Sequence, residues 1–447
     1  MFRSMNVVSG TLLFERDAQS WHEFGQQLES LRRQQQVFAA LTVTGRTGLL
    51  AALADRLAAE RHRLARMVCE EVGRCLRECE AELDKSVELI RYYAHLAPEL
   101  LAHKTIATQA SLSQVRFEPL GVVLAVMPWN YPIWQVLRFA VPALCAGNAC
   151  VVKPAPSVAR VTAALFELVG DALPFQTAWL NHEDTLRAIE HVDALAFTGS
   201  TATGRRLAAQ AGQHLKKSVL ELGGSNAFIV MPDADLAQAA KDACYSRFRD
   251  AGQSCNAAKR IIVTDAVVDE FLPLFLAECA KLKTGDPMDE ATTLAPLHRE
   301  DLRARVHGQV QDALAHGAVA LCGGEMPGGA GWFYPATVLD GVNPACRVYH
   351  EEVFGPVAML LRARDEAHAV WLANDNPFGL GASIYSADEE RAWRYAEKIQ
   401  AGSVFVNRHT SSDLRLPFGG VKASGYGREL SEFGLYEFVN VKSYWQK

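Results

Sequence analysis

Residues 194–224 read ALAFTGSTATGRRLAAQAGQHLKKSVLELGG, a pattern typical of one strand–helix–strand unit. The apolar run at 194–197 predicts a short buried strand, and a turn of glycine, serine and threonine follows it. Residues 205–215 then carry a helical pattern before a second strand at 218–222. Because neighbouring parallel strands need a long crossover between them, this order favours a parallel α/β sheet.

The same alternation continues along the rest of the chain. Further strands are expected at 113–126, 149–152, 228–230, 260–263, 357–361, 383–385 and 403–406, and further helices at 236–249, 267–282, 303–316, 366–372 and 389–399. Residues 21–101 instead predict an almost entirely helical region. Two α/β series in one chain favour two lobes with a ligand-binding cleft between them.

The composition indicates a globular chain with the length of two or three domains. Of its 447 residues, 49% are hydrophobic and 21% are charged. A net charge of −6 without a dense Lys/Arg run disfavours a nucleic-acid partner. The sequence predicts no membrane span and no signal peptide. The ten cysteines are scattered, and Cys75 and Cys79 lack the partners of a zinc site, so we expect no metal and a cytoplasmic location with reduced thiols.

Three short motifs carry candidate catalytic groups. Cys255, in Gly-Gln-Ser-Cys, is a candidate nucleophile, although an isolated cysteine is more often a small buried hydrophobe. Glu221 precedes a glycine pair and could act as a general base, or be a solvated carboxylate at a strand end. Asn130 follows Pro128 and could donate to an oxyanion, or form an Asx turn.

Taken together, these motifs resemble the aldehyde dehydrogenase superfamily. The resemblance rests on Pro-Trp-Asn at 128–130, Phe-Thr-Gly-Ser at 197–200, Glu-Leu-Gly-Gly at 221–224, Gly-Gln-Ser-Cys at 252–255, Glu-Glu-Val-Phe-Gly-Pro at 351–356 and Pro-Phe-Gly-Gly-Val-Lys-Ala-Ser-Gly at 417–425. It extends from about Trp21 to Trp445 and is nearest to the shorter bacterial succinate-semialdehyde dehydrogenases.

The resemblance implies NAD(P)-dependent oxidation of an aldehyde, succinate semialdehyde or a similar semialdehyde, to the carboxylate. Cys255 would form a thiohemiacetal and then a thioester, Asn130 would stabilise the oxyanion, and Glu221 would activate water for hydrolysis. NADP is expected to be tolerated or even preferred, because Pro156 stands where strict NAD enzymes often carry Glu. The implied cofactor-binding residues are Trp129, Lys153, Gly199, Ser200, Gly204, Leu222, Glu352 and Phe354.

Arginines are the expected partners of a substrate carboxylate. The resemblance implies this role for Arg138, with a surface or interface position as the alternative. Arg408 and Arg415 belong to a late loop that lines the substrate tunnel in this family, and they are further candidates. If the substrate is an uncharged aliphatic or aromatic aldehyde, Arg138 should point away from the tunnel.

Two other readings stay open. One is transfer of the thioester to coenzyme A, which the presence of Glu221 disfavours because that base serves hydrolysis. The other is a non-catalytic structural or binding relative, which the complete set of motifs disfavours.

Three departures from the family pattern carry expectations. Asp250 replaces a usual Asn and could raise the pKa of the Cys255 thiol, or simply cap local backbone. The N-terminus is expected to lack an early strand segment. Residues 174–187 form a short stretch without the usual glycines, which puts cofactor affinity in question.

The expected architecture is an aldehyde-dehydrogenase-like α/β fold of two α/β lobes plus a small β element. A Rossmann-type NAD(P)-binding domain is assigned to residues 1–103 and 124–226, and a catalytic domain to 227–416. An oligomerisation element is assigned to 104–123 and 417–447. Edge strands of this element pair between subunits in the family, so the resemblance implies a homodimer or homotetramer.

Overall fold

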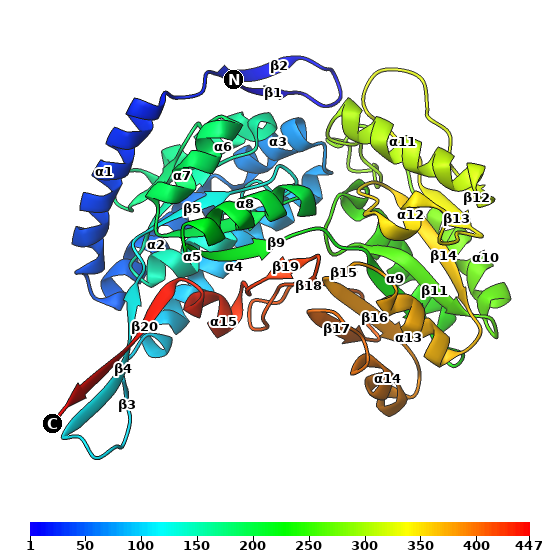
Figure 1. Ribbon diagram of the computed structural model, residues 1–447. Coiled ribbons are helices and arrows are strands. Elements are labelled where there is room, and N and C mark those ends of the chain that lie inside the picture. Colours follow the sequence, from blue (N-terminus) through cyan, green and yellow to red (C-terminus); the bar gives the residue numbers. More distant parts are fainter.

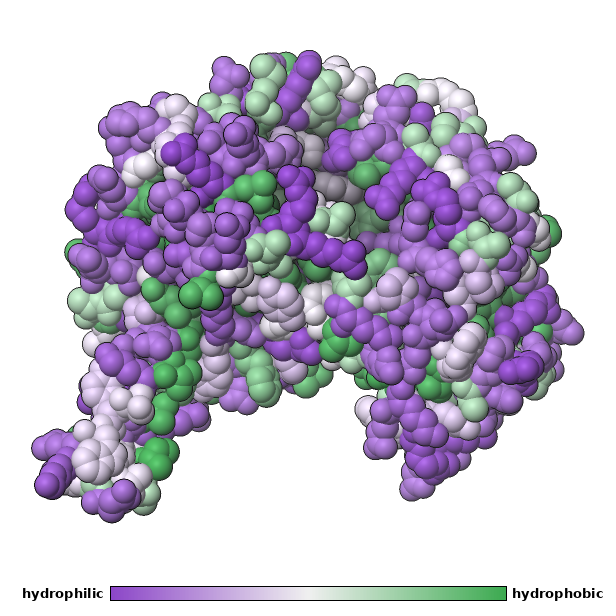
Figure 2. Space-filling view, viewed as in Figure 1, coloured by the Kyte–Doolittle hydropathy of each residue, from purple (hydrophilic) through white to green (hydrophobic).

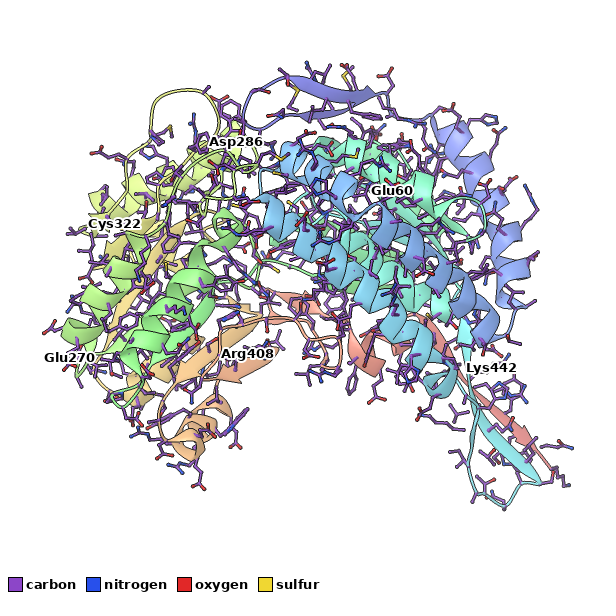
Figure 3. All side chains as sticks on the ribbon, turned by 180° about the vertical axis from the view of Figure 1, so that it is seen from behind. Glu60, Glu270, Asp286, Cys322, Arg408 and Lys442 are labelled. Carbon is purple, nitrogen blue, oxygen red and sulfur yellow. The ribbon has the colours of Figure 1, made fainter.

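The computed structural model describes residues 1–447. Four helices confirm the expected helical region near the N-terminus: α1 Trp21–Ala39, α2 Val43–Ala59, α3 Arg61–Val72 and α4 Leu76–Leu100. Helix α1 begins with a capping box, in which Ser20 accepts from the Glu23 amide and the Glu23 side chain accepts from Ser20. Seen from behind, α2, α3 and α4 cover one face of the first lobe (Figure 3), whereas α1 packs against the other face of its sheet.

The first lobe contains a six-stranded sheet in the order β19-β9-β8-β5-β6-β7, in which only β19 is antiparallel. Its strands are β5 Val122–Val126, β6 Ala149–Lys153, β7 Phe175–Thr177, β8 Ala194–Thr198, β9 Lys217–Glu221 and β19 Gly425–Tyr426. The connecting helices are α5 Trp134–Cys145, α6 Ala159–Val169, α7 His182–Ala188 and α8 Thr201–Gln213. The parallel sheet predicted for residues 194–224 is therefore present.

The second lobe contains a seven-stranded sheet in the order β12-β13-β14-β11-β10-β16-β17. Its strands are β10 Asn226–Val230, β11 Ala258–Thr264, β12 Val319–Cys322, β13 Thr337–Asp340, β14 Val357–Ala363, β16 Gly381–Tyr385 and β17 Ser403–Val406. Its helices are α9 Leu236–Phe248, α10 Val268–Cys279, α11 Glu300–Ala315, α12 Arg347–His350, α13 Glu366–Asn374 and α14 Glu389–Ala396. Figure 1 shows the two lobes side by side, joined by crossing segments between them.

A β arm projects from the first lobe (Figure 1). It consists of β3 Lys104–Thr105, β4 Leu112–Pro119 and β20 Val439–Gln446, which pair antiparallel in the order β20-β4-β3. Figure 2 shows apolar side chains along this arm, and Val441 and Trp445 on β20 are 60% and 58% exposed. Figure 3 marks the arm by Lys442. The helix α15 Ser431–Tyr436 leads into β20.

The final segment of the chain joins more than one sheet. Strand β19 extends the first-lobe sheet, whereas β18 Val421–Lys422 pairs with β15 Phe378–Gly379 in a separate two-stranded sheet. Residues 417–447 therefore connect the two lobes and the arm. No single helix is both long and apolar enough to cross a membrane, and only the sharply bent pair α1 and α2 meets such a test, by length and composition alone.

The expectation that the N-terminus lacks an early strand is wrong. Strands β1 Phe2–Met5 and β2 Leu12–Arg16 form an antiparallel hairpin. Phe2 is buried and packs edge-on against Trp179, with ring centroids 5.1 Å apart. The hairpin was not predicted because its strands are short and contain few apolar residues. Phe2 is buried by Trp179, which lies far away in the sequence, so no local pattern marks the strand.

Candidate active site

The nucleophile loop, residues 249–257, leads from α9 to β11 and carries Cys255. Asp250, Ala251 and Gly252 adopt φ values of +54°, +51° and +72°. Such left-handed backbone is costly for a residue with a side chain, by roughly 1–2 kcal/mol each. The loop therefore needs external contacts to hold it, and Asp250 supplies several of them.

Asn130 lies beside this loop and is buried. Its Nδ2 donates to the carbonyl oxygen of Gln253 at 3.0 Å, two residues before Cys255. A side-chain amide carries two N–H hydrogens, so the second hydrogen is available to a group bound at Cys255. The structure thus brings together two of the three predicted catalytic residues.

Glu221 ends β9 and is buried, with neither carboxylate oxygen hydrogen-bonded. Burial raises its pKa well above the usual range, and the neighbouring Glu429 raises it further, while Arg138 and Arg428 act in the opposite direction. A carboxyl group with a raised pKa and unoccupied oxygens is a stronger base than an ordinary carboxylate, which suits a general base.

Burial also raises the pKa of the Cys255 thiol. Arg138 and Lys259 oppose this effect by favouring the thiolate, whereas Glu352 and Glu221 add to it. The idea that Asp250 raises this pKa is not supported, because Asp250 is not among these groups. The charge of Asp250 is instead balanced by Arg74.

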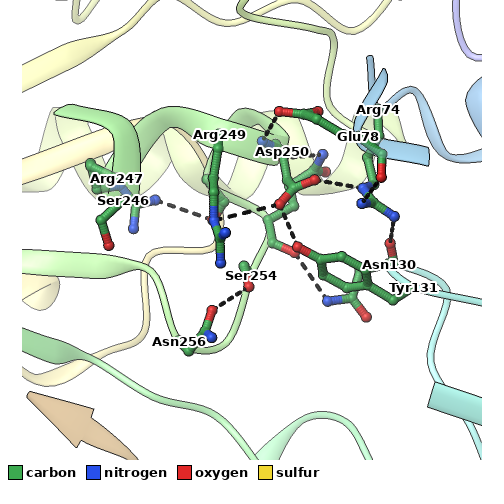
Figure 4. A network of polar contacts seen from close by, with 12 residues as sticks. Arg74, Glu78, Asn130, Tyr131, Ser246, Arg247, Arg249, Asp250, Ser254 and Asn256 are labelled. Atoms are coloured by element: carbon green, nitrogen blue, oxygen red, sulfur yellow. Dashed lines mark hydrogen bonds and ion pairs between the residues drawn. The ribbon is translucent and has the colours of Figure 1, made fainter. Parts of the chain in front are cut away.

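Asp250 belongs to a buried polar network (Figure 4). Its Oδ1 accepts from Nε of Arg74 at 2.6 Å, and its Oδ2 accepts from the Tyr131 hydroxyl. Although burial favours the neutral acid, Arg74 and Arg249 hold the pKa of Asp250 below its usual value. Arg74 also pairs with Glu82.

Arg138 is buried and lines the cavity of about 190 Å³ that contains Cys255. Its guanidinium forms an ion pair with Glu429 and lies 4.9 Å from the ring centre of Phe418. The alternative of a surface or interface position is therefore excluded. Its positive charge, however, is already matched by Glu429 within the protein.

Arg408 and Arg415 do not line this cavity. Arg408 is exposed, and the side chain of Arg415 is 77% exposed and pairs with Asp413 at 2.7 Å. The expectation that they contact the substrate is therefore not met by their positions.

Two cations that the sequence reasoning missed do line the Cys255 cavity. The side chain of Arg249 is 22% exposed, and its Nε makes no hydrogen bond but forms a long ion pair with Oδ2 of Asp250 at 3.9 Å. Lys85 donates to the backbone oxygen of Ser412 at 2.9 Å and to its hydroxyl, and it lies over the ring of Trp134. Burial, followed by Arg138 and Arg249, lowers the pKa of Lys85 to about 8. Arg249 could have been noticed from its place in the nucleophile loop, whereas Lys85 lies on α4, far away in sequence.

A second cavity of about 390 Å³ has the features of a phosphate-binding site. It includes Ser200, which caps the N-terminus of α8, and the cationic side chains Arg205 and Arg305. Free amides at a helix start favour anionic groups. Gly204, on the same helix, packs so closely that an added Cβ would lie 2.4 Å from Leu222.

Two of the remaining predicted cofactor residues line this second cavity. Glu352 and Phe354 line it, and Trp129 packs edge-on against Phe354 at 5.7 Å. Gly199 precedes the cap of α8, and a Cβ there would lie 2.5 Å from the ring of Phe197. Lys153 ends β6 and is buried, which lowers its pKa to about 8. Lys153 does not line the cavity itself.

Comparisons with known proteins agree with this geometry. The family model described as the aldehyde dehydrogenase family matches residues 2–444. The chain is 45% identical to an aldehyde dehydrogenase of Paenarthrobacter nicotinovorans over 402 residues, 88% of each chain. It is 43% identical to the NAD(P)+ succinate semialdehyde dehydrogenase of Escherichia coli (strain K12) over 396 residues, 87% of this chain and 86% of that one.

The fold is likewise that of a solved relative. The crystal structure of a succinic semialdehyde dehydrogenase from Streptococcus pyogenes, in complex with NADP+, is similar with a TM-score of 0.97. The sequence identity is 34%, and the match covers 100% of this chain and 99% of that chain. The resemblance and the fold class inferred from the sequence are confirmed: the chain belongs to the aldehyde dehydrogenase family.

Proposed function

We propose that this enzyme oxidises succinate semialdehyde, or another short aldehyde with a distal carboxylate, to the dicarboxylate. The observation that supports this substrate class is Arg249 in the cavity of Cys255, whose Nε makes no hydrogen bond and lies 3.9 Å from Oδ2 of Asp250. The Asp250 oxygens already accept from Arg74 and Tyr131, so Arg249 can still donate to an entering carboxylate. A hydrogen bond to a charged group contributes about 1.5–3 kcal/mol. Lys85 adds a second positive charge to the same cavity.

The residues around Cys255 suit a two-step acyl transfer. The thiolate would attack the aldehyde carbon, and the free Asn130 amide hydrogen would stabilise the oxyanion. Glu221, with its orphaned oxygens, would then take a proton from water during hydrolysis of the thioester. Because this base is in place, hydrolysis is favoured over transfer of the acyl group to coenzyme A.

The second cavity fits the dinucleotide of this family, because it combines a helix N-terminus, two arginines and closely packed glycine backbone. Ser200, Arg205 and Arg305 would hold its phosphates, and Glu352 and Phe354 would hold the nicotinamide half. When bound, the nicotinamide accepts the hydride that the aldehyde loses. NADP should be accepted, since Pro156 brings no carboxylate that would repel a 2′-phosphate.

Initial rates of cofactor reduction test the substrate class. Wild-type enzyme should prefer succinate semialdehyde to butanal, and Arg249→Gln should lower kcat/KM for succinate semialdehyde by about 10–100-fold, the value of one charge-assisted contact. Butanal should change little. The matched control Arg415→Gln alters an exposed arginine outside the cavity and should leave both substrates unaffected. Equal turnover of both aldehydes by the wild type would favour an uncharged substrate instead.

We further propose that the enzyme is a cytoplasmic homodimer or homotetramer assembled through the β arm. All ten cysteines are free thiols, as expected in a reducing compartment. The exposed Val441 and Trp445 offer an apolar surface on an edge strand. Light scattering of Val441→Asp should report a smaller particle than the wild type, and an unchanged mass would argue against assembly through the arm.

A further inference from the structure

Lys259 is a fully buried lysine at the start of β11, and it is neither the nucleophile, the oxyanion donor nor the general base. Its Nζ donates to the backbone oxygens of Ser254 and Cys255, each at 2.9 Å. It also lies 3.1 Å from Oε1 of Glu352. An ammonium group has three N–H hydrogens, so these three acceptors satisfy it completely.

Glu352 links this lysine to two other parts of the site. Its Oε1 also accepts from the amide of Gly224, at 3.1 Å, in the loop that follows Glu221. Gly223 approaches so closely that an added Cβ would lie 2.6 Å from Oε2 of Glu352. Because Glu352 also lines the second cavity, Lys259 stands where the nucleophile loop, the Glu221 loop and the cofactor cavity meet.

We propose that Lys259 is a positioning residue for the reaction, which holds the nucleophile loop and Glu352 in register and supplies, beside Arg138, a buried positive charge that stabilises the Cys255 thiolate. Two anions compete for this one ammonium: the Glu352 carboxylate and the thiolate of Cys255. Buried charges without a partner are costly. Removing the Glu352 carboxylate should therefore strengthen the effect of Lys259 on the thiolate, and removing Lys259 should leave both anions less stable.

The electrostatics around Cys255 are consistent with this role. Burial raises the pKa of the thiol most, Arg138 and Lys259 lower it, and Glu352 and Glu221 raise it. Arg138 is already paired with Glu429, whereas Lys259 contacts the Cys255 backbone directly. The proposal rests on Cys255 being the nucleophile, and it does not depend on which aldehyde is the substrate.

The test is the pH profile of Cys255 alkylation by iodoacetamide in the enzyme without cofactor or substrate, followed by mass spectrometry of the Cys255 peptide from about pH 6 to about pH 10. Lys259→Met should move the midpoint upward by about one pH unit and slow alkylation near neutral pH about tenfold. Titration with NADP+ should also show weaker binding, because Glu352 loses its anchor. Lys281→Met, which replaces an exposed lysine, is the matched control and should leave the alkylation midpoint and the NADP+ affinity unchanged.

Glu352→Gln is the complementary variant, for which the opposite shift is expected. It keeps an acceptor for Gly224 but removes the competing carboxylate, so the midpoint of alkylation should move downward. A merely structural role would disturb both variants in the same direction. The proposal is overturned if the two midpoints shift the same way or if neither moves, and Glu352→Gln alone decides if Lys259→Met does not fold. Because no aldehyde is used, the result is independent of the proposed substrate.

Discussion

Nε of Arg74 lies 2.6 Å from Oδ1 of Asp250, and both side chains are buried. The Tyr131 hydroxyl donates to the other oxygen of the same carboxylate, and Arg74 also reaches the carbonyl oxygen of Asn130 at 3.5 Å. This pair therefore ties the segment that carries Asn130 to the strained loop that leads to Cys255. It acts through geometry rather than through the charge felt by the thiol.

Replacing Asp250 with Asn should destabilise the protein without changing the Cys255 pKa. Arg74 would lose one of two carboxylate partners but keep Glu82, so we expect a loss of about 2 kcal/mol, below the 3–5 kcal/mol typical of a fully broken buried pair. Thermal unfolding measures the loss. Asp413→Asn, which breaks an exposed pair, should cost under ~1 kcal/mol. A large shift in the alkylation profile of Asp250→Asn would contradict this account.

Lys85 should make the affinity for an anionic substrate depend on pH. Its pKa is about 8, so the side chain is charged below that pH and loses its charge as the pH rises through it. The charges that face Lys85 are Arg138 and Arg249, which lower its pKa, and Glu88 and Asp413, which raise it. The KM for succinate semialdehyde should therefore rise above about pH 8, relative to that for butanal.

Both substrates react at Cys255, so the effect of its titration drops out of the ratio of the KM for succinate semialdehyde to the KM for butanal. In Lys85→Met the ratio should be shifted toward butanal by roughly tenfold at neutral pH and should no longer vary with pH. A wild-type ratio that stays flat from neutral to alkaline pH would remove Lys85 from carboxylate recognition.

Glu221→Gln should block hydrolysis of the thioester more than its formation. Because the pKa of Glu221 is raised, its basic form grows as the pH increases beyond the usual carboxyl range, so wild-type turnover should rise with pH there. The variant should lose about 10²–10⁴-fold in steady-state rate. Intact-mass measurement after mixing with aldehyde and cofactor should detect an acyl group on Cys255. Loss of turnover without this adduct would show that Glu221 acts earlier.

Gly204→Ala should weaken cofactor binding by crowding the start of α8. The new methyl group would lie 2.4 Å from Cδ2 of Leu222, and such overpacking typically costs 1–3 kcal/mol, or about 5–150-fold in the Kd for NADP+. Fluorescence titration measures the Kd. The double variant Gly204→Ala/Leu222→Ala should recover part of the affinity. Gly212→Ala, on the same helix with no neighbour within 4 Å, is the matched control and should bind normally.

The strands and the helices of both lobes could be predicted because their signals are local. Apolar runs such as 194–197 and 357–361 have the strand pattern within themselves, and the structure places β8 and β14 there. Boundaries were less certain, since α8 begins at Thr201 rather than at residue 205. Its first turn is polar, and only the Ser200 cap marks the start.

The sequence by itself also determined the reaction class, because Cys255, Glu221 and Asn130 lie in short motifs that stay recognisable without a structure. Only the tertiary structure decided how charge is arranged around them. Whether Arg138 is free depends on Glu429, which the chain brings back to it from a distant segment. Lys85 becomes part of the Cys255 cavity because α4 packs against that loop, and Lys259 becomes a buried cation beside Cys255 because β11 begins directly after the loop. Long-range packing sets these burial and pairing relationships, and local sequence patterns carry no signal for them.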